Sequence, residues 1–372
     1  MSNLDLRPSP TECGGRADTA ARPVRELLEP RRVPLGESTE VRRLLPNLGR
    51  RMVGAWCFVD HYGPDDIAEE PGMRVPPHPH IGLQTVSWLH QGEVVHRDSL
   101  GSHQRVGPRE LGLMTSGRAI AHSEESPRDH ARFLLGAQLW VALPDAHRNT
   151  APAYEYHAAL PEVAGAGAGA GLSATVLLGE LDGARSPGTT YSPLVGADLT
   201  LDEGAEARLP VDPDFEYAVL TMDGRTEVDG VRLDPGSMLY LGCGRRELPL
   251  RAESAAGLLL LGGEPFEEKL VMWWNFVART HEEIAGARAD WMAGQGAGAS
   301  AGEQPSAPPR RTPSGEGPAG TTGGAGAAAA DGAVGEGPRG ADRFGGVEGY
   351  DGPPLPAPML PATPLKARGR TR

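Results

Sequence analysis

Two pairs of side chains with the chemistry of metal ligands stand out in the sequence. His78 and His80 are separated by one residue, and so are His122 and Glu124. In a β-strand the side chains at positions i and i+2 point to the same face, so each pair can present two ligands to one point. Roughly forty residues separate the pairs, which leaves room for several strands to bring the second pair opposite the first.

Three imidazoles and one carboxylate suit a borderline divalent metal, namely Fe(II), Mn(II), Ni(II), Cu(II) or Zn(II). Four protein ligands also leave room for two more groups, as expected of a metal that binds oxygen or substrate directly. Structural zinc usually recruits thiolates, but Cys13, Cys57 and Cys243 lie far apart and form no CxxC pair. A lone HxH pair is more often solvated or hydrogen-bonded, whereas a second pair at the same spacing favours metal ligation.

Two other glutamates compete for the role of the carboxylate ligand. Glu125 would point away from His122 on a strand, and Glu93 follows a turn glycine, where we expect it to be solvated. Glu124 is therefore the preferred carboxylate.

The histidines are unevenly distributed along the chain. Seven of the eleven lie between positions 61 and 122 and none lies between 158 and 280, so imidazole chemistry belongs to the first half of the chain. His61 is expected to brace a turn, and His96, beside a turn, is a candidate for holding a ligand in orientation. The histidines expected on the surface or in loops are His90, His103, His130, His147 and His157.

The segments that must position these residues read as short strands joined by tight turns. Stretches rich in β-branched, aromatic or other apolar residues end at Gly, Asp or Pro. They lie at 83–90, 93–98 and 132–144 in the first half, and at 173–181, 197–202, 216–242 and 256–263 in the second. Asp-Gly at 223–224 and at 229–230 predicts hairpin turns. The pattern predicts two consecutive antiparallel β-barrels, at about 31–157 and 173–265.

One helix is predicted near the end of the second unit. Thr280 and Glu283 have capping-box spacing, the helix follows over 281–292, and Gly294 lies just past it. One face of this helix is apolar and is expected to pack against the barrels. The second unit therefore spans 173–294, a barrel plus a closing helix.

Three segments have few apolar side chains or an excess of Gly, Ala and Pro. Such segments bury too little surface to offset the entropy lost when the backbone is ordered. We therefore expect a flexible N-terminal segment at 1–30, a Gly/Ala linker at 158–172 and a disordered tail at 295–372.

The overall charge and composition narrow the class of protein. The formal net charge of −13 disfavours direct binding to nucleic acid. The N-terminal segment lacks the apolar core of a signal peptide, and the longest apolar runs are too short to span a membrane. A sparse, odd number of cysteines fits a reducing compartment. We expect a cytoplasmic protein that binds neither nucleic acid nor membranes.

Three blocks of sequence resemble the pirin family in their order and spacing. They are FVDHYGP (58–64), PPHPHIGLQTVSWLHQGEVVHRDSLG (76–101) and GLMTSGRAIAHSE (112–124), and 263–284 is similar to the closing segment of bacterial pirins. The resemblance runs from about residue 33 to 292 and implies a bicupin in which only the N-terminal barrel, 31–157, carries metal. The expected fold is all-β, with two tandem antiparallel cupin (jelly-roll) barrels, a C-terminal helix and a disordered tail.

The resemblance also implies a cofactor and a quaternary state. One non-haem Fe(II) per chain is expected, other divalent transition metals remain open, and a monomer is favoured. The metal ligands implied by the family pattern are His78, His80, His122 and Glu124.

Two functions of different classes follow from this resemblance. Some bacterial pirins resemble quercetinases, so the preferred hypothesis is a dioxygenase that opens the ring of flavonols such as quercetin, in the manner of quercetin 2,3-dioxygenase. Its partners would be a small aromatic substrate and O2, and Glu124 would be the catalytic base for the flavonol 3-hydroxyl. The alternative is an iron-dependent redox-sensing regulator that binds a transcription factor or a metabolic enzyme. A metal-free structural bicupin is disfavoured because all four ligand types match.

Overall fold

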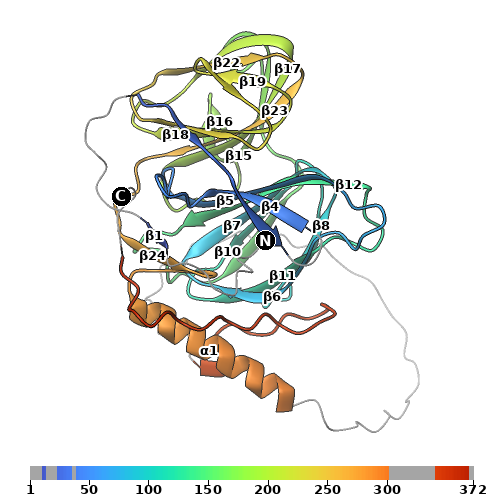
Figure 1. Cartoon of the computed structure of the whole chain (residues 1–372), viewed down its shortest axis with the longest axis vertical. Helices are drawn as coiled ribbons and strands as arrows, with labels where there is room; N and C mark the ends of the chain where they lie inside the picture. The colour runs from blue at the N-terminus through green and yellow to red at the C-terminus, as the bar shows by residue number, and fades with distance from the viewer. Residues whose placement is uncertain (1–10, 14–22, 36–38, 301–339, 368–372) are drawn as a thin grey trace, which may run out of the picture.

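The computed structural model describes residues 11–13, 23–35, 39–300 and 340–367. Two β-barrels lie one above the other along the long axis of the molecule, and a helix crosses the far end of the first barrel (Figure 1). This arrangement confirms the expected all-β fold with two tandem barrels and a closing helix.

The first barrel consists of two antiparallel sheets. In the described part of the chain the larger sheet has seven strands in the order β13-β10-β7-β12-β5-β4-β3, and the smaller has four in the order β6-β11-β8-β9. The larger sheet contains β3 (Arg31–Leu35), β4 (Thr39–Leu45), β5 (Trp56–Asp66), β7 (Leu83–Gln91), β10 (Leu111–Thr115), β12 (Phe133–Ala142) and β13 (Ala153–His157). The smaller sheet contains β6 (Arg74–His80), β8 (Val94–Asp98), β9 (His103–Val106) and β11 (Ile120–Glu125).

The second barrel is formed by one curled sheet, which recruits a strand from near the N-terminus. Its strands are β2 (Glu26–Leu28), β14 (Glu162–Ala164), β15 (Ala168–Leu181), β16 (Ala184–Arg185), β17 (Leu194–Pro210), β18 (Glu216–Asp223), β19 (Thr226–Val228), β20 (Val231–Leu233), β21 (Met238–Gly242), β22 (Glu247–Ala252) and β23 (Ala256–Gly263). Its interior is an apolar cluster dominated by leucine, valine and alanine.

The two predicted Asp-Gly turns have different outcomes. Val228 pairs with Val231, so Asp229 and Gly230 form the two-residue hairpin between β19 and β20, and both have positive φ as such a turn requires. Strands β18 and β19 flank the other Asp-Gly turn but pair with other strands, because β18 lies between β21 and β23. That turn is therefore a corner of the barrel.

Large apolar side chains join the two barrels into one core. The cluster that contains Trp56, Trp88 and Trp140 also includes residues of β15, β18, β21 and β23. Trp56 donates from Nε1 to the backbone oxygens of Val195 and Gly262, at 3.2 and 3.1 Å. The larger sheet of the first barrel therefore packs against the second barrel with its outer face. Its inner face lines the interior of the first barrel.

Helix α1 (His281–Ser300) begins with the predicted capping box. Thr280 Oγ1 accepts the Glu283 N–H at 3.2 Å, and Glu283 Oε2 accepts the Thr280 N–H at 3.3 Å. The helix continues past Gly294, so this glycine does not end it. No helix in the described residues is long and apolar enough to cross a membrane.

Parts of the N-terminal segment and the Gly/Ala linker that were expected to be flexible form paired strands, while residues 1–10 and 14–22 lie outside the described residues. Strand β1 (Thr11–Cys13) pairs with β24 (Leu270–Trp273), which pairs with β25 (Phe276–Ala278), and β2 pairs with β21. The linker contributes β14 and the start of β15, which pairs with β17 from Ala168 onward. Backbone pairing with distant strands places β1, β2, β14 and the start of β15 in sheets, and composition gives no sign of such pairing.

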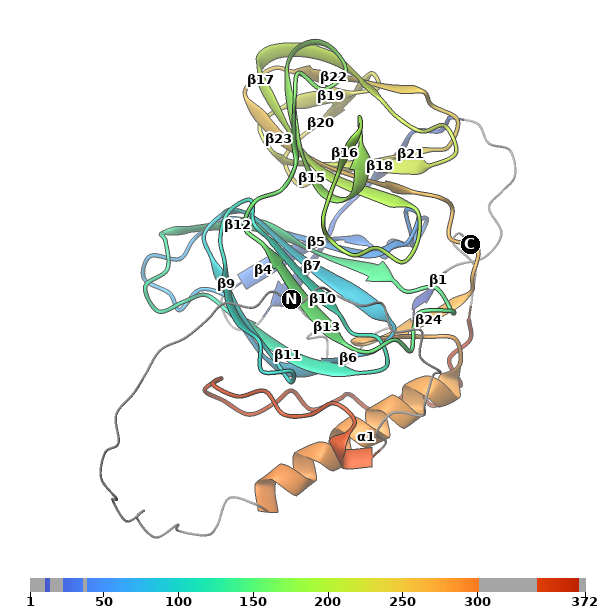
Figure 2. The ribbon, with the colours of Figure 1, turned by 180° about the vertical axis from the view of Figure 1, so that it is seen from behind.

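The tail also differs from the expectation of disorder over 295–372. Residues 295–300 belong to α1, and residues 340–367, which include the 3₁₀ turn η1 (Gly340–Asp342), return and pack between α1 and the sheet of β6 and β11 (Figure 2). Phe344, Ala357 and Leu365 are buried there in a cluster with Trp291. A few well-spaced apolar residues anchor this segment. The rest of the predicted tail, 301–339 and 368–372, lies outside the described residues.

Candidate metal centre

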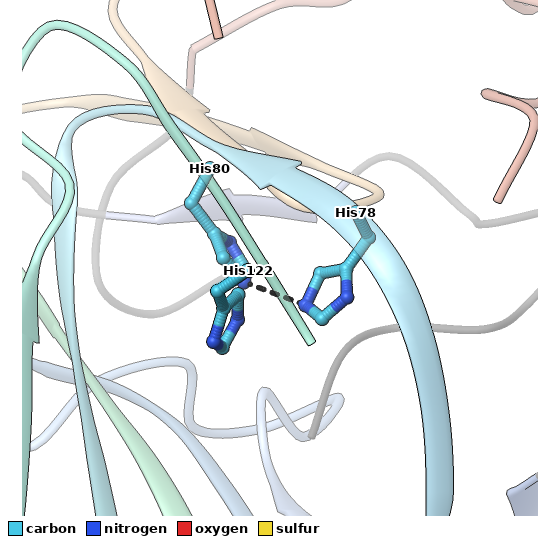
Figure 3. A group of neighbouring side chains, drawn as sticks. All are labelled: His78, His80 and His122. Carbon is cyan, nitrogen blue, oxygen red and sulfur yellow. Dashed lines mark hydrogen bonds between the residues drawn. The ribbon is translucent and has the colours of Figure 1, made fainter. Parts of the chain in front are cut away.

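Three histidine side chains converge inside the first barrel. Strands β6 and β11 are antiparallel neighbours, and His122 lies directly opposite His78 in their register. His80 is two residues further along β6, so its side chain faces the same way as His78. All three are fully buried, and their rings meet with centroids 4.3 to 4.9 Å apart (Figure 3).

The hydrogen bonds of His78 and His80 decide which ring nitrogen carries the proton. His78 Nδ1 lies 2.8 Å from the Pro76 carbonyl oxygen, and His80 Nδ1 lies 2.9 Å from the Asn275 carbonyl oxygen. A carbonyl oxygen can only accept, so both Nδ1 atoms carry hydrogen. In the neutral rings both Nε2 atoms then hold lone pairs, and these two nitrogens lie 3.1 Å apart.

His122 completes the group with a nitrogen that finds no partner. Its Nε2 is buried and makes no hydrogen bond with the described residues, while its Nδ1 lies 3.4 Å from His96 Nδ1. Burial lowers the pKa of His78 to about 3 and lowers the pKa values of His80 and His122 well below the ordinary range. All three imidazoles are therefore neutral at pH 7, and neutral imidazole is the form that binds metal.

Glu124 reaches the same interior from β11 across an irregularity in the pairing with β6. It is 1% exposed, and its Oε1 accepts the hydroxyl hydrogen of Ser87 at 2.7 Å. The terminal amide of Gln138 lies 3.1 Å from the same hydroxyl. Ser87 and Gln138 come from β7 and β12 of the larger sheet, so Glu124 is held from the opposite wall of the barrel.

The structure brings the three predicted histidine ligands together and places Glu124 in a second group with His96 and His122. Ligand atoms of His78, His80 and His122 lie within 4.8 Å of one another, and so do those of His96, His122 and Glu124. Both groups share His122. Among the residues that the structure describes, both clusters of this kind lie in the first barrel, as the distribution of histidines along the chain predicted.

These residues fit a divalent metal ion. Without a cation, the lone pairs on Nε2 of His78 and His80 would face each other at 3.1 Å, and Nε2 of His122 would be buried with no partner among the described residues. Two nitrogens bound at right angles to one metal at about 2.1 Å would lie about 3 Å apart. The observed separation matches that geometry, and a metal would satisfy all three nitrogens.

The other histidines are placed partly as expected. His103 and His147 are exposed, and His130 and His157 are half-buried. His96 is buried beside His122 and stacks on Tyr154, with ring centroids 4.0 Å apart.

Two histidines lie where the sequence did not place them. His61 is fully buried in β5, where its Nδ1 accepts a hydrogen bond from Arg42. His90 was expected on the surface, but its side chain is only 9% exposed and lies between carboxylates of the second barrel. The burial of His90 could not be predicted from its neighbours in sequence, because those carboxylates lie more than a hundred residues away along the chain.

Several residues around the site were missed by sequence reasoning. Ser87 and Asp98 lie at strand positions that the alternation directs inward. That alternation alone is a weak indication that a residue belongs to the site. The Asn275 carbonyl lies 195 residues from His80 and gives no sequence signal. Trp140, whose ring packs edge-on against His80 at 5.1 Å, reads simply as a core residue.

Comparisons with known proteins agree with the two-barrel arrangement. A family model described as Pirin matches residues 38–141, and one described as Pirin C-terminal cupin domain matches residues 196–296. A Pseudomonas aeruginosa protein named "Putative quercetin 2,3-dioxygenase PA1205" is 46% identical over 264 residues, which cover 71% of this chain and 82% of the relative. A pirin-like protein of Caulobacter vibrioides is 39% identical over 275 residues, covering 72% of this chain and 93% of the relative.

A solved structure is similar along most of the chain. The crystal structure of a quercetin 2,3-dioxygenase from Acinetobacter baumannii superposes with a TM-score of 0.76 at 35% identity. The match covers 92% of this chain and 97% of the Acinetobacter chain.

Proposed function

This chain belongs to the pirin family, and we propose that it is a non-haem Fe(II) dioxygenase that opens the ring of flavonols such as quercetin. One Fe(II) per chain would be held by His78, His80, His122 and Glu124. The observation that carries the proposal is the convergence of three buried imidazoles inside the first barrel, with the Glu124 carboxylate grouped with one of them, His122. The names of the Pseudomonas and Acinetobacter proteins support the choice of substrate class.

The protein's own residues would hold the metal and the substrate proton. Fe(II), when bound, supplies a redox-active Lewis acid suited to chemistry between O2 and an ionised phenol. Glu124 is the proposed general base, which takes the proton of the flavonol 3-hydroxyl onto its carboxylate. Ser87 donates to Oε1 of that carboxylate at 2.7 Å and fixes its orientation.

Backbone carbonyls would orient the histidine ligands, and the barrel walls would exclude water. The Pro76 and Asn275 carbonyls hold His78 and His80 by their Nδ1–H groups, so their Nε2 atoms face one point. The Trp140 ring is fully buried and packs edge-on against His80, so it forms part of the wall around the ligands. Such walls would keep bulk water from the reacting groups.

Oxygen consumption by the Fe(II)-loaded protein tests this proposal. The protein is loaded with Fe(II) without air, and O2 uptake and carbon monoxide release are followed after quercetin is added. We expect both to depend on quercetin and to disappear in His122→Ala. His103→Ala, which changes an exposed histidine of the same barrel, is the matched control and should keep the activity.

Iron binding without quercetin-dependent O2 uptake would contradict the proposal. If one Fe(II) per chain is bound but quercetin causes no O2 uptake, the flavonol dioxygenase proposal is wrong. The next experiment would then compare protein partners of the Fe(II) and Fe(III) forms, as the redox-regulator hypothesis requires.

A further inference from the structure

Asp98 and His96 form a buried hydrogen-bonded pair behind His122. His96 Nε2 lies 3.0 Å from Asp98 Oδ2, and the two residues are 3% and 2% exposed. The other carboxylate oxygen, Oδ1, accepts the backbone N–H groups of Leu100 and Ser102 at 2.9 and 3.0 Å. The carboxylate is therefore fixed by the turn on one side and meets the imidazole on the other.

The hydrogen bonds of this pair bear on which ring nitrogen of His122 carries the hydrogen. Oδ1 of Asp98 is engaged by the two backbone N–H groups of the turn, so Oδ2 is the oxygen that faces His96 Nε2. A carboxylate oxygen accepts, so when one ring nitrogen of His96 carries hydrogen that nitrogen is Nε2, and Nδ1 holds the lone pair. That lone pair faces His122 Nδ1 at 3.4 Å, so His122 Nδ1 must donate. Nε2 of His122 is left with the lone pair.

His78 and His80 need no second side chain to set the position of their hydrogens. The Nδ1–H groups of His78 and His80 bond to backbone carbonyls, which cannot reverse their role. His122 bonds to another imidazole, which can act as donor or acceptor, so its direction has to be set from outside. Tyr154 stacks on His96 with an interplanar angle of 8° and keeps the ring in the plane that this requires.

We propose that Asp98 and His96 are positioning residues that fix His122 as the Nδ1–H tautomer and thereby direct its Nε2 toward the metal point shared with His78 and His80. The inference rests on the metal-binding part of the proposed function and not on the flavonol chemistry.

Asp98→Asn tests the direction of this relay, the chain of hydrogen bonds that runs from Asp98 through His96 to His122. Oδ1 at position 98 is already engaged by two N–H groups, so the new amide would present its NH2 to His96 Nε2. His96 Nε2 would become an acceptor, its Nδ1 a donor, and His122 would be driven to carry its hydrogen on Nε2. An aspartate-to-asparagine change beside a histidine inverts the tautomer by the same logic in serine proteases.

Two readouts without turnover follow the change. Long-range 1H–15N NMR of histidine-labelled, metal-free protein reports the tautomer, and the His122 signal is identified by its loss in His122→Ala. We expect Nδ1–H in the wild type and Nε2–H in Asp98→Asn. Zn(II) is the redox-inert probe, titrated against a chromophoric chelator, and its affinity should fall by about 10- to 100-fold.

A double variant separates the relay from a merely structural role. His96→Phe keeps a ring on Tyr154 but cannot transmit the reversal, so adding it to Asp98→Asn should restore part of the Zn(II) affinity. A structural role predicts further loss. Asp223→Asn, which changes a carboxylate beside His90 in the second barrel, is the matched control and should bind Zn(II) like the wild type.

The inference is overturned if His122 keeps Nδ1–H in Asp98→Asn, or if the Zn(II) affinity of that variant stays within twofold of the wild type. Thermal unfolding of the metal-free variants shows that each one is folded before its affinity is compared. Because neither readout uses quercetin, a failed relay and a failed dioxygenase proposal give different results.

Discussion

His90 Nε2 lies 2.8 Å from Asp198 Oδ2, and this contact joins the two barrels. His90 belongs to β7 of the first barrel and Asp198 to β17 of the second. Trp88 donates its Nε1–H to the same carboxylate oxygen at 2.9 Å, and Asp223 Oδ2 lies 3.4 Å from His90 Nδ1. Two carboxylates of one barrel therefore enclose an imidazole of the other.

This contact predicts that stability falls at high pH. Burial lowers the pKa of His90, but the bonds to Asp198 and Asp223 outweigh it and raise the pKa to about 9, from 6.5 in an unfolded chain. A raised pKa means that the stabilisation is complete below about pH 6.5 and is lost as the pH rises through 9. The maximum contribution is about 3 kcal/mol. The melting temperature between pH 6 and 10 measures it.

His90→Gln should remove this dependence. The wild type should lose more thermal stability between pH 7 and 10 than the variant does, and His130→Gln, a half-buried histidine away from the barrel interface, should behave as the wild type. Neighbouring His61 does not contribute, because burial, and to a lesser degree Arg42, lowers its pKa to about 3 and it stays neutral in this range. Parallel curves for wild type and His90→Gln would rule out the prediction.

Metal removal should destabilise the protein through the four candidate ligands. Binding to the folded state alone stabilises it, so chelation is expected to lower the melting temperature of the wild type. His78→Ala and His122→Ala should each bind Fe(II) at least about tenfold more weakly and show little response to chelator. Iron per chain, measured by mass spectrometry after anaerobic loading, is the direct check. Equal iron content in wild type and His122→Ala would contradict the assignment.

Ser87→Ala should reduce turnover without loss of metal. The change removes the hydrogen bond to Glu124 Oε1, and a bond to a charged group contributes about 1.5–3 kcal/mol. We therefore expect the kcat/KM for quercetin to fall about tenfold or more while iron content stays near one per chain. Ser123→Ala, whose hydroxyl makes no hydrogen bond with the described residues, is the neighbouring control. Equal rates for the two variants would exclude the proposed role of Ser87.

Phe344→Ala should release the returning C-terminal segment. Phe344 is 3% exposed and packs on Trp291 and Phe276, with ring centroids 5.7 and 6.0 Å apart. Loss of a buried Phe costs about 3–5 kcal/mol, and Phe344 is the largest buried side chain that this segment adds to the cluster. Hydrogen exchange at the Leu355 N–H, which bonds to the Pro77 carbonyl, should become fast.

Met359→Ala is the control for that segment, because Met359 is 86% exposed. It should leave exchange at Leu355 unchanged. Slow exchange at Leu355 in Phe344→Ala would show that the segment is held by other contacts, such as the bond from Trp291 Nε1 to the Leu355 carbonyl oxygen.

Local patterns were enough to predict the barrels and the candidate ligands. The i, i+2 spacing places His78 with His80 and His122 with Glu124 whatever the rest of the chain does, because alternation is a property of the strand itself. The capping box of Thr280 and Glu283 is likewise a local feature, and it forms as predicted. The Asp229-Gly230 hairpin belongs to the same class.

Contacts between distant segments could not be predicted in this way. Composition marked 340–367 as disordered, yet Phe344 finds a site formed by α1 and β25, which no local window contains. His90 read as a surface residue because its partners, Asp198 and Asp223, lie in the other barrel.

The sequence by itself determined which side chains share a strand face, and hence which four residues are candidates to bind metal. Only the tertiary structure decided how those side chains are oriented. The position of the hydrogen on His80 depends on the Asn275 carbonyl, 195 residues away. The position of the hydrogen on His122 depends, through His96, on the carboxylate of Asp98 at the end of β8. Hydrogen-bond direction is set by the neighbour in space, and the alternation of a strand carries no information about that neighbour.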